Sequence, residues 1–191
     1  MTIRERIAFC HNCGIRKYQP PLLDALPTDS KVIMCVDFAA PKLQAGIAPE
    51  KNPLSCFPAK EILSQPIKDM QKIGYAFYHT YLLKCTPMLN GASRKPFKHE
   101  LQSCFSHLQE EINTLQPQAV LLFGQNTYLA VFDILGLTFQ KWKGVYFDIY
   151  KYNGINYIPI SRPMMGDIKH QNNYKIYWEC INNVLMRCLK D

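Results

Sequence analysis

Two cysteines near the start of the chain have the spacing of a metal-binding or redox motif. Cys10 and Cys13 form a C-x-x-C in the stretch IAFCHNCGIRKYQ, which supplies half of a four-thiolate ligand shell. Cys85, in LLKCTP, and Cys104, in LQSCFSH, can complete the shell if the chain between them folds back. On spacing alone, a zinc site, an iron–sulfur cluster and unrelated buried thiols all remain open.

Other residues of the same types bear on this choice. Three histidines are potential zinc ligands, although lone histidines are more often surface or structural residues: His11, His99 and His107. Three further cysteines lie in apolar or helical patterns, and we interpret them as buried packing residues: Cys35, Cys180 and Cys188.

Composition limits the class of protein. The chain has 191 residues, 48% of them hydrophobic and 19% charged, which favours one compact domain over 1–191. No apolar run reaches the roughly 18 residues that a membrane span needs, and no export signal is visible. We expect a soluble, cytoplasmic monomer that does not bind membranes. In a reducing compartment, clustered thiols bind metal or do redox work more often than they form disulfides. The net charge of +7 makes nucleic acid a candidate partner.

The elements that must position these residues can be read from the apolar pattern. Four apolar runs predict strands: 31–38, 75–84, 119–124 and 157–160. Three patterns predict helices: 96–116, 126–136 and 173–189. Asn153-Gly154 lies between two aromatic-rich runs and predicts a type I′ hairpin that leads into the last strand.

This alternation predicts an α/β fold, a three-layer α/β/α sandwich around a central, mostly parallel, four-stranded sheet. Ligands of such sheets bind outside the carboxyl ends of the strands. We therefore expect the functional site in the loops that follow residues 38, 84, 124 and 160.

The stretch from 78 to 132 contains an ordered set of motifs. A strand ends in Lys-Cys, a loop with Pro and Arg leads to a helix with E-x-x-x-C, and a proline precedes an apolar strand that ends in glycine. The residues are Lys84, Cys85, Pro87, Arg94, Pro96, Glu100, Cys104, Pro117, Phe123 and Gly124. This pattern resembles the iron–sulfur uracil-DNA glycosylases, the family 4 branch of the uracil-DNA glycosylase superfamily, and the order of elements extends the resemblance over most of the chain.

The resemblance implies a cofactor. Cys10 and Cys13 stand where the family has its C-x-x-C, so the resemblance implies that they hold a [4Fe-4S] cluster with Cys85 and Cys104. A cluster held by thiolates far apart in sequence would close long loops whose entropy otherwise opposes folding. The N-terminal segment is therefore expected to be a cluster-binding part of the domain.

The resemblance also implies an activity, hydrolysis of the N-glycosidic bond of a damaged or deaminated base in DNA during base excision repair. The family motif G-E-A-P-G corresponds to VDFAAPK, where Asp37 keeps the carboxylate that positions water, while Val36 and Ala40 replace glycines. The family motif H-P-S corresponds to SRPMMG, where Arg162 replaces the histidine that stabilises the departing base.

The base-binding positions differ from the family pattern. Tyr81 stands where the family has the asparagine that reads uracil, and a phenol cannot repeat a bidentate amide contact. Phe57 matches the family's stacking aromatic, and a plain core or loop aromatic is the alternative. Uracil, hypoxanthine and xanthine are therefore all candidate bases.

DNA contacts are expected from two loops, with duplex or single-stranded DNA as the partner and the target base flipped out. In GASRKPFK we expect Arg94, Lys95 and Lys98 to contact phosphates, the alternative being a solvated charged loop. Met164 can act as an apolar wedge between bases or pack locally. A second hypothesis for the whole protein is a catalytically weakened iron–sulfur protein that binds nucleic acid.

Overall fold

A five-stranded sheet forms the centre of the computed structural model, which describes residues 2–15, 21, 23, 25–27, 31–42, 68–138, 146–161 and 171–188. Its strand order is β2-β1-β5-β7-β6. The strands are β1 (Lys31–Ala39), β2 (Tyr75–Leu83), β5 (Ala119–Phe123), β6 (Tyr150–Tyr152) and β7 (Ile155–Ile160). Strands β2, β1, β5 and β7 pair in parallel with their neighbours, and β6 is antiparallel to β7.

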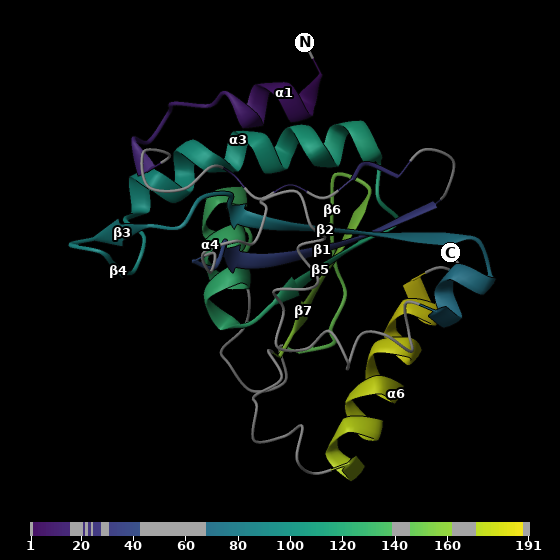
Figure 1. The fold of residues 1–191 in the computed structure, drawn as a ribbon. Helices are drawn as coiled ribbons and strands as arrows, with labels where there is room; N and C mark the ends of the chain where they lie inside the picture. Colours follow the sequence, from purple (N-terminus) through teal and green to yellow (C-terminus); the bar gives the residue numbers. More distant parts are fainter. Residues whose placement is uncertain are drawn as a thin grey trace.

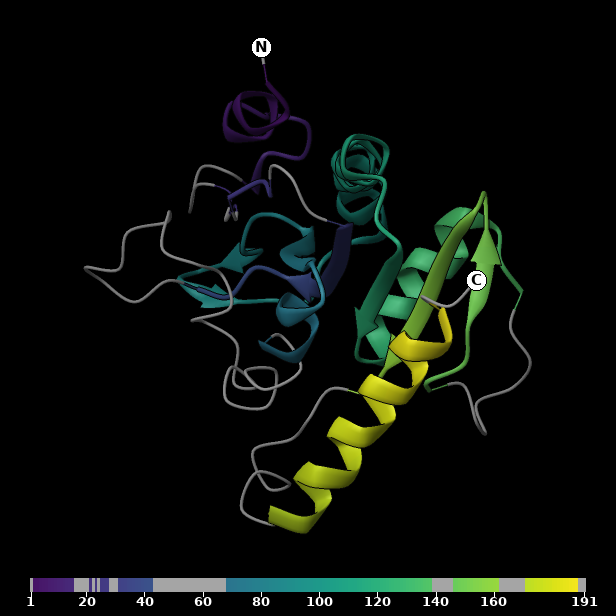
Figure 2. The ribbon, with the colours of Figure 1, turned by 90° about the vertical axis from the view of Figure 1, so that its right-hand side faces the viewer.

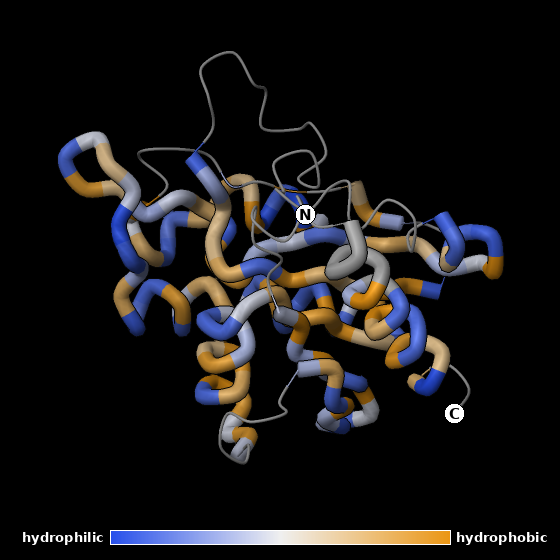
Figure 3. The backbone as a smooth tube through the Cα atoms, turned by 90° about the horizontal axis from the view of Figure 1, so that it is seen from below, coloured by the Kyte–Doolittle hydropathy of each residue, from blue (hydrophilic) through white to orange (hydrophobic). Residues whose placement is uncertain are grey.

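Helices cover both faces of the sheet (Figures 1 and 2). On one face, α3 (Lys98–Leu115) and α4 (Gln125–Leu135) pack on side chains that include Met34, Val36 and Leu122. On the other face, α6 (Gln171–Cys188) contributes Ile181, Val184 and Leu185 to the core. The short helix α1 (Ile3–Ala8) lies on the outer side of α3 (Figure 1). Hydrophobic and hydrophilic stretches alternate along the described backbone in Figure 3.

The helix ends follow from local chemistry. Glu100 accepts a hydrogen bond from the backbone N–H of Phe97 at 2.7 Å, which satisfies one of the open donors at the start of α3. Gly136, with φ of 67°, takes the left-handed conformation that ends α4. At α1, Thr2 and Glu5 form a capping box across the first turn.

Two Asn-Gly dipeptides form tight hairpins. Asn153 and Gly154 join β6 to β7 with φ of 49° and 78°, the positive values that a type I′ turn requires. Asn90 and Gly91, with φ of 51° and 79°, join β3 (Met88–Leu89) to β4 (Ala92–Ser93) in the same way. The first hairpin was predicted. The second was not, although its sequence carries the same signal.

The predicted fold class is confirmed, with four parallel strands at the predicted places and β6 as a fifth, antiparallel strand. Cys35 and Cys188 are buried, as expected, whereas Cys180 is only half-buried. Within the described residues, no helix is both long and apolar enough to cross a membrane.

Candidate active site and cysteine pocket

The four cysteines of the predicted ligand set line one pocket. The knuckle after α1 contributes Cys10 and Cys13, the end of β2 leads into Cys85, and α3 contributes Cys104. The pocket is lined almost wholly by these segments: Ile7, Cys10, His11, Cys13, Gly14, Pro21, Leu83, Lys84, Cys85, Cys104 and His107. The fold therefore brings together thiols that lie up to 94 residues apart in the chain (104 minus 10).

Backbone amides point at two of these sulfurs. The N–H of Lys84 donates to Cys104 Sγ at 3.4 Å, and the N–H of Asn12 donates to Cys10 Sγ at 3.4 Å. Hydrogen bonds of this kind stabilise negative charge on a thiolate. Further out, an ion pair between Arg6 and Glu110 joins α1 to α3 and so holds the knuckle against the helix.

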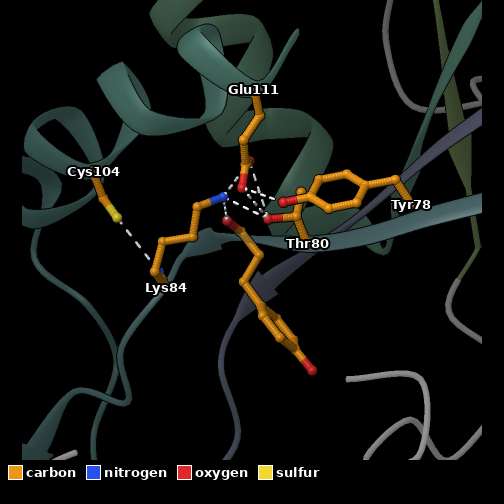
Figure 4. Close-up of polar contacts among 6 residues, drawn as sticks. Tyr78, Thr80, Lys84, Cys104 and Glu111 are labelled. Carbon is orange, nitrogen blue, oxygen red and sulfur yellow. Dashed lines mark hydrogen bonds and ion pairs between the residues drawn. The ribbon is translucent and has the colours of Figure 1, made fainter. Parts of the chain in front are cut away.

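A buried polar network stands behind the pocket (Figure 4). Lys84 Nζ donates to Glu111 Oε2 at 2.6 Å, to Thr80 Oγ1 at 2.6 Å and to the Tyr81 carbonyl oxygen at 2.8 Å. Glu111 Oε1 accepts from the Tyr78 hydroxyl at 2.7 Å. All three ammonium donors are thus used, and the network ties α3 to the end of β2 next to Cys85.

Burial controls protonation around the pocket. It raises the pKa of the Cys104 thiol to about 11, and the positive charge of Lys84 opposes this shift. Without a bound cation, Cys104 therefore stays protonated at neutral pH, and metal binding would have to displace its proton. Burial also lowers the pKa of His107, with Lys84 adding to the effect, and this favours the neutral form of its imidazole.

A second cluster lies at the carboxyl ends of β1 and β2. Asp37 and Tyr81 are register partners in these parallel strands, so their side chains leave the sheet side by side on the same face. Asp37 is 3% exposed, and its Oδ1 accepts from the N–H of Phe38 at 2.8 Å, which orients the carboxylate. A buried carboxylate beside a phenol at this edge stands where ligands of open α/β sheets bind.

The two clusters are connected by one side chain. The Thr86 hydroxyl lies 2.9 Å from the Ala40 carbonyl oxygen and 2.8 Å from that of Pro41, and can donate its hydrogen to either. Thr86 follows Cys85 directly, and Ala40 lies three residues after Asp37. The segment that follows Cys85 therefore also contacts the loop that follows Asp37.

Comparison with known proteins agrees with this architecture. The sequence model of the family described as "Uracil DNA glycosylase superfamily" matches residues 6–181, which include both clusters. The chain belongs to the uracil DNA glycosylase superfamily. A protein named type-5 uracil-DNA glycosylase from Pyrobaculum aerophilum is 36% identical over 66 residues, which are 35% of this chain and 27% of that relative. The chain thus matches about a quarter of the length of this relative, and the predicted superfamily is confirmed.

The predicted phosphate contacts of this superfamily member lie in different surroundings. Arg94 forms a bidentate pair with Glu100, at 2.8 and 2.5 Å, and its guanidinium stacks 4.3 Å from the ring centroid of Phe97. Lys98 is exposed and pairs with Asp133, and Lys95 is exposed. The two lysines are therefore more accessible to a phosphate than Arg94 is. Three other predicted site residues lie outside the described residues: Phe57, Arg162 and Met164.

Sequence reasoning missed two polar residues that the fold places around the two clusters. Glu111 lies seven residues after Cys104 on α3, on the same helix face, and a glutamate within an apolar stripe was the available signal. His79 is fully buried two residues before Tyr81, and their rings meet edge to face at 5.0 Å. Burial and the charge of Lys84 lower the pKa of His79 to about 3.

The candidate metal ligands are only partly brought together by the fold. Among the described residues, no group of three or more His, Cys, Asp or Glu side chains is arranged so that it could hold a metal ion. His11 and His107 line the pocket of the four cysteines, whereas His99 is exposed on α3 and stacks on Phe97. The pocket therefore contains the four predicted thiols and two of the three candidate histidines.

Proposed function

We propose that this protein is a DNA glycosylase that hydrolyses the N-glycosidic bond of a damaged or deaminated base in DNA. The carrying observation is the buried Asp37 carboxylate beside Tyr81 at the carboxyl edge of the sheet, in a chain of the uracil DNA glycosylase superfamily. Cleavage of the glycosidic bond needs a group that positions water or stabilises positive charge on the sugar as the bond breaks. An oriented carboxylate supplies both.

In this proposal the other site residues divide the remaining tasks. Tyr81 contacts the flipped base through a single hydroxyl, which donates and accepts one hydrogen bond at a time. Phe57 stacks on the base, and Arg162 stabilises the leaving base through its permanent charge. Lys95 and Lys98, with Arg94, hold phosphates, and Met164 fills the gap left by the flipped nucleotide. Because a tyrosine replaces the amide that reads uracil, hypoxanthine and xanthine are candidate bases beside uracil.

A panel of oligonucleotides tests the activity. Duplex and single-stranded DNA with one uracil, hypoxanthine or xanthine are incubated with an excess of protein, and abasic sites are detected by alkaline cleavage. We expect wild-type protein to release at least one base and Asp37→Asn to slow release by about 10²- to 10⁴-fold.

Asp69→Asn is the matched control, because Asp69 pairs with the exposed Lys72 ahead of β2. This pair lies near the amino ends of the strands, whereas Asp37 lies near their carboxyl ends. Asp69→Asn should leave the rate unchanged. Absence of any abasic product from all substrates would overturn the glycosylase proposal, and equal losses in both variants would remove Asp37 from the mechanism.

We further propose that Cys10, Cys13, Cys85 and Cys104 hold a [4Fe-4S] cluster. Four cysteines around one pocket are the donor set of such clusters, and amides already point at two of the sulfurs. A cluster of four irons is wider than one ion, so its thiolates stand farther apart than the ligands of a single zinc. When bound, it would link the N-terminal knuckle to β2 and α3.

Anaerobic purification tests the cofactor. We expect a brown protein that contains iron and acid-labile sulfide in equal amounts, and loss of both in Cys104→Ser. Cys180→Ser, on the half-buried face of α6, is the matched control and should keep both. A colourless protein with stoichiometric zinc would overturn the cluster.

A further inference from the structure

His107 contributes a polar group to the cysteine pocket that no other described residue uses. The residue is 8% exposed and lines the pocket together with the four cysteines. Its Nε2 atom is buried and has no hydrogen-bond partner among the described residues. Buried polar atoms are almost always hydrogen-bonded, and one left unsatisfied costs about 1–3 kcal/mol. An occupant of the pocket would remove this cost.

The position of His107 on α3 fits such an occupant. His107 follows Cys104 by three residues, so both side chains lie on the same face of the helix, toward the pocket. One turn further along that face, Glu111 is already saturated by Lys84, Thr80 and Tyr78. The network behind the pocket therefore does not use the imidazole.

We infer that His107 donates a hydrogen bond from Nε2–H to a sulfur of the group held by the four cysteines. This inference rests on the proposed cluster. A neutral imidazole carries one N–H and one acceptor nitrogen, so it can serve as the donor without a positive charge. Together with the amides of Lys84 and Asn12, it would be a third N–H donor directed at sulfur in this pocket.

The expected consequence is electrostatic. Hydrogen bonds to the sulfurs are among the factors that set the potential of an iron–sulfur cluster, because they stabilise its more negative, reduced state. They also slow loss of the cluster by strengthening its hold in the pocket. His107 is thus a positioning residue for the cofactor and takes no part in breaking the glycosidic bond.

Two substitutions separate hydrogen bonding from packing. His107→Phe keeps a buried ring but removes the donor, whereas His107→Gln keeps an amide N–H near the position of Nε2. The matched control is His99→Phe, which makes the same exchange at an exposed site on the same helix. Each protein is purified anaerobically with its cluster, and the reduction potential and the rate of iron loss to a chelator are measured.

We expect His107→Phe to lower the reduction potential of the cluster. It should also speed iron loss by about five- to tenfold, the factor that corresponds to the free energy of one hydrogen bond. His107→Gln should lie close to wild type, and His99→Phe should match it. The same potential and rate in His107→Phe as in wild type would overturn this role alone. Loss of the cluster from both His107 variants would show that His107 acts through packing, and this result would also overturn the proposed hydrogen bond. Wild-type protein without iron would overturn the cofactor proposal, and this inference with it.

Discussion

Helix α3 takes part in two lysine–carboxylate pairs of similar length and very different burial. Lys84 Nζ lies 2.6 Å from Glu111 Oε2, with side chains 1% and 0% exposed. Lys98 Nζ lies 2.8 Å from Asp133 Oδ2, with side chains 69% and 60% exposed. Water and salt screen the second pair, whereas the first cannot lose one charge without leaving the other buried. Burial, not distance, decides what each pair does.

The difference has a functional meaning in the proposed enzyme. The buried pair is adjacent to Cys85 and holds the end of β2 against α3, so it positions the cysteine pocket. The exposed pair holds Lys98 only weakly, and a DNA phosphate can replace Asp133 as its partner. Arg94 and Glu100 lie between these extremes, with side chains 19% and 4% exposed. Changes at the three pairs should therefore have graded effects.

The largest effect is expected at the buried pair. Glu111→Leu leaves the Lys84 ammonium without its counter-charge in an apolar setting, which should lower the free energy of unfolding by about 3–5 kcal/mol. Chemical denaturation, followed by circular dichroism, measures this change. The variant should also retain less iron, since Lys84 and Cys85 are neighbours at the end of β2.

The double variant Lys84→Met with Glu111→Leu is the control for this prediction. It removes both charges together, so most of the lost stability should return. A double variant as unstable as Glu111→Leu would show that packing around Glu111, and not the unpaired lysine, determines the loss.

A smaller, pH-dependent effect is expected at Arg94. Hydrogen bonding to Arg94 holds the pKa of the Glu100 carboxyl below its ordinary value of 4.5, with help from the Phe97 amide. A lowered pKa contributes stability that is complete above the unfolded value and is lost as the pH falls through the folded value. Arg94→Ala should therefore cost about 1–2 kcal/mol at pH 7, with a smaller difference from wild type in acid.

Denaturation of wild type and Arg94→Ala between pH 7 and about pH 2, across the range of ordinary carboxyl pKa values, measures this dependence. Arg94→Lys keeps the charge without the bidentate geometry and should fall between the two. A constant difference over this range would mean that stacking on Phe97, rather than the pair with Glu100, carries the contribution of Arg94.

The smallest effect on stability is expected at the exposed pair. Lys98→Ala should change the free energy of unfolding by less than about 0.5 kcal/mol. If Lys98 contacts a phosphate, the same change should weaken DNA binding and reduce the slope of log K against log salt by about 0.9. Fluorescence anisotropy with a labelled duplex at several salt concentrations measures this slope.

Lys72→Ala is the matched control, because Lys72 is equally exposed and pairs with Asp69 ahead of β2, away from the candidate site. It should leave both stability and the salt slope unchanged. Equal slopes for wild type and Lys98→Ala would remove Lys98 from the DNA surface.

Much of the fold could be predicted because local rules and the global structure agree. The continuous apolar runs of β1 and β5 identified central parallel strands, and the periodic stripe from Leu101 to Leu115 identified α3. The β3–β4 hairpin was missed although Asn90-Gly91 is a typical turn sequence, because its strands are two residues long and carry no alternating pattern.

The candidate site was predicted less completely. A C-x-x-C is visible in one line of sequence, and Cys85 and Cys104 were candidate partners from their positions after a strand and on a helix. Only the family resemblance favoured an iron–sulfur cluster over zinc or unrelated thiols. Glu111 and His107 gave a weak signal, since a polar residue within a helical stripe is usually taken as a boundary position. Asp37 was predicted from a motif, while its pairing with Tyr81 depends on strand register that the sequence does not state.

By itself, the sequence determined the central strands, the three long helices, the α/β/α fold class and the residue types available for chemistry, because these depend on short-range periodicity and turn preferences. Only the tertiary structure decided which residues meet: that the four cysteines share one pocket, that Lys84 pairs with Glu111 in the interior, and that His107 Nε2 has no hydrogen-bond partner within the part of the chain that the structure describes. The physical reason is that burial and neighbours set the protonation and the hydrogen bonding of a side chain, and both are properties of the folded chain.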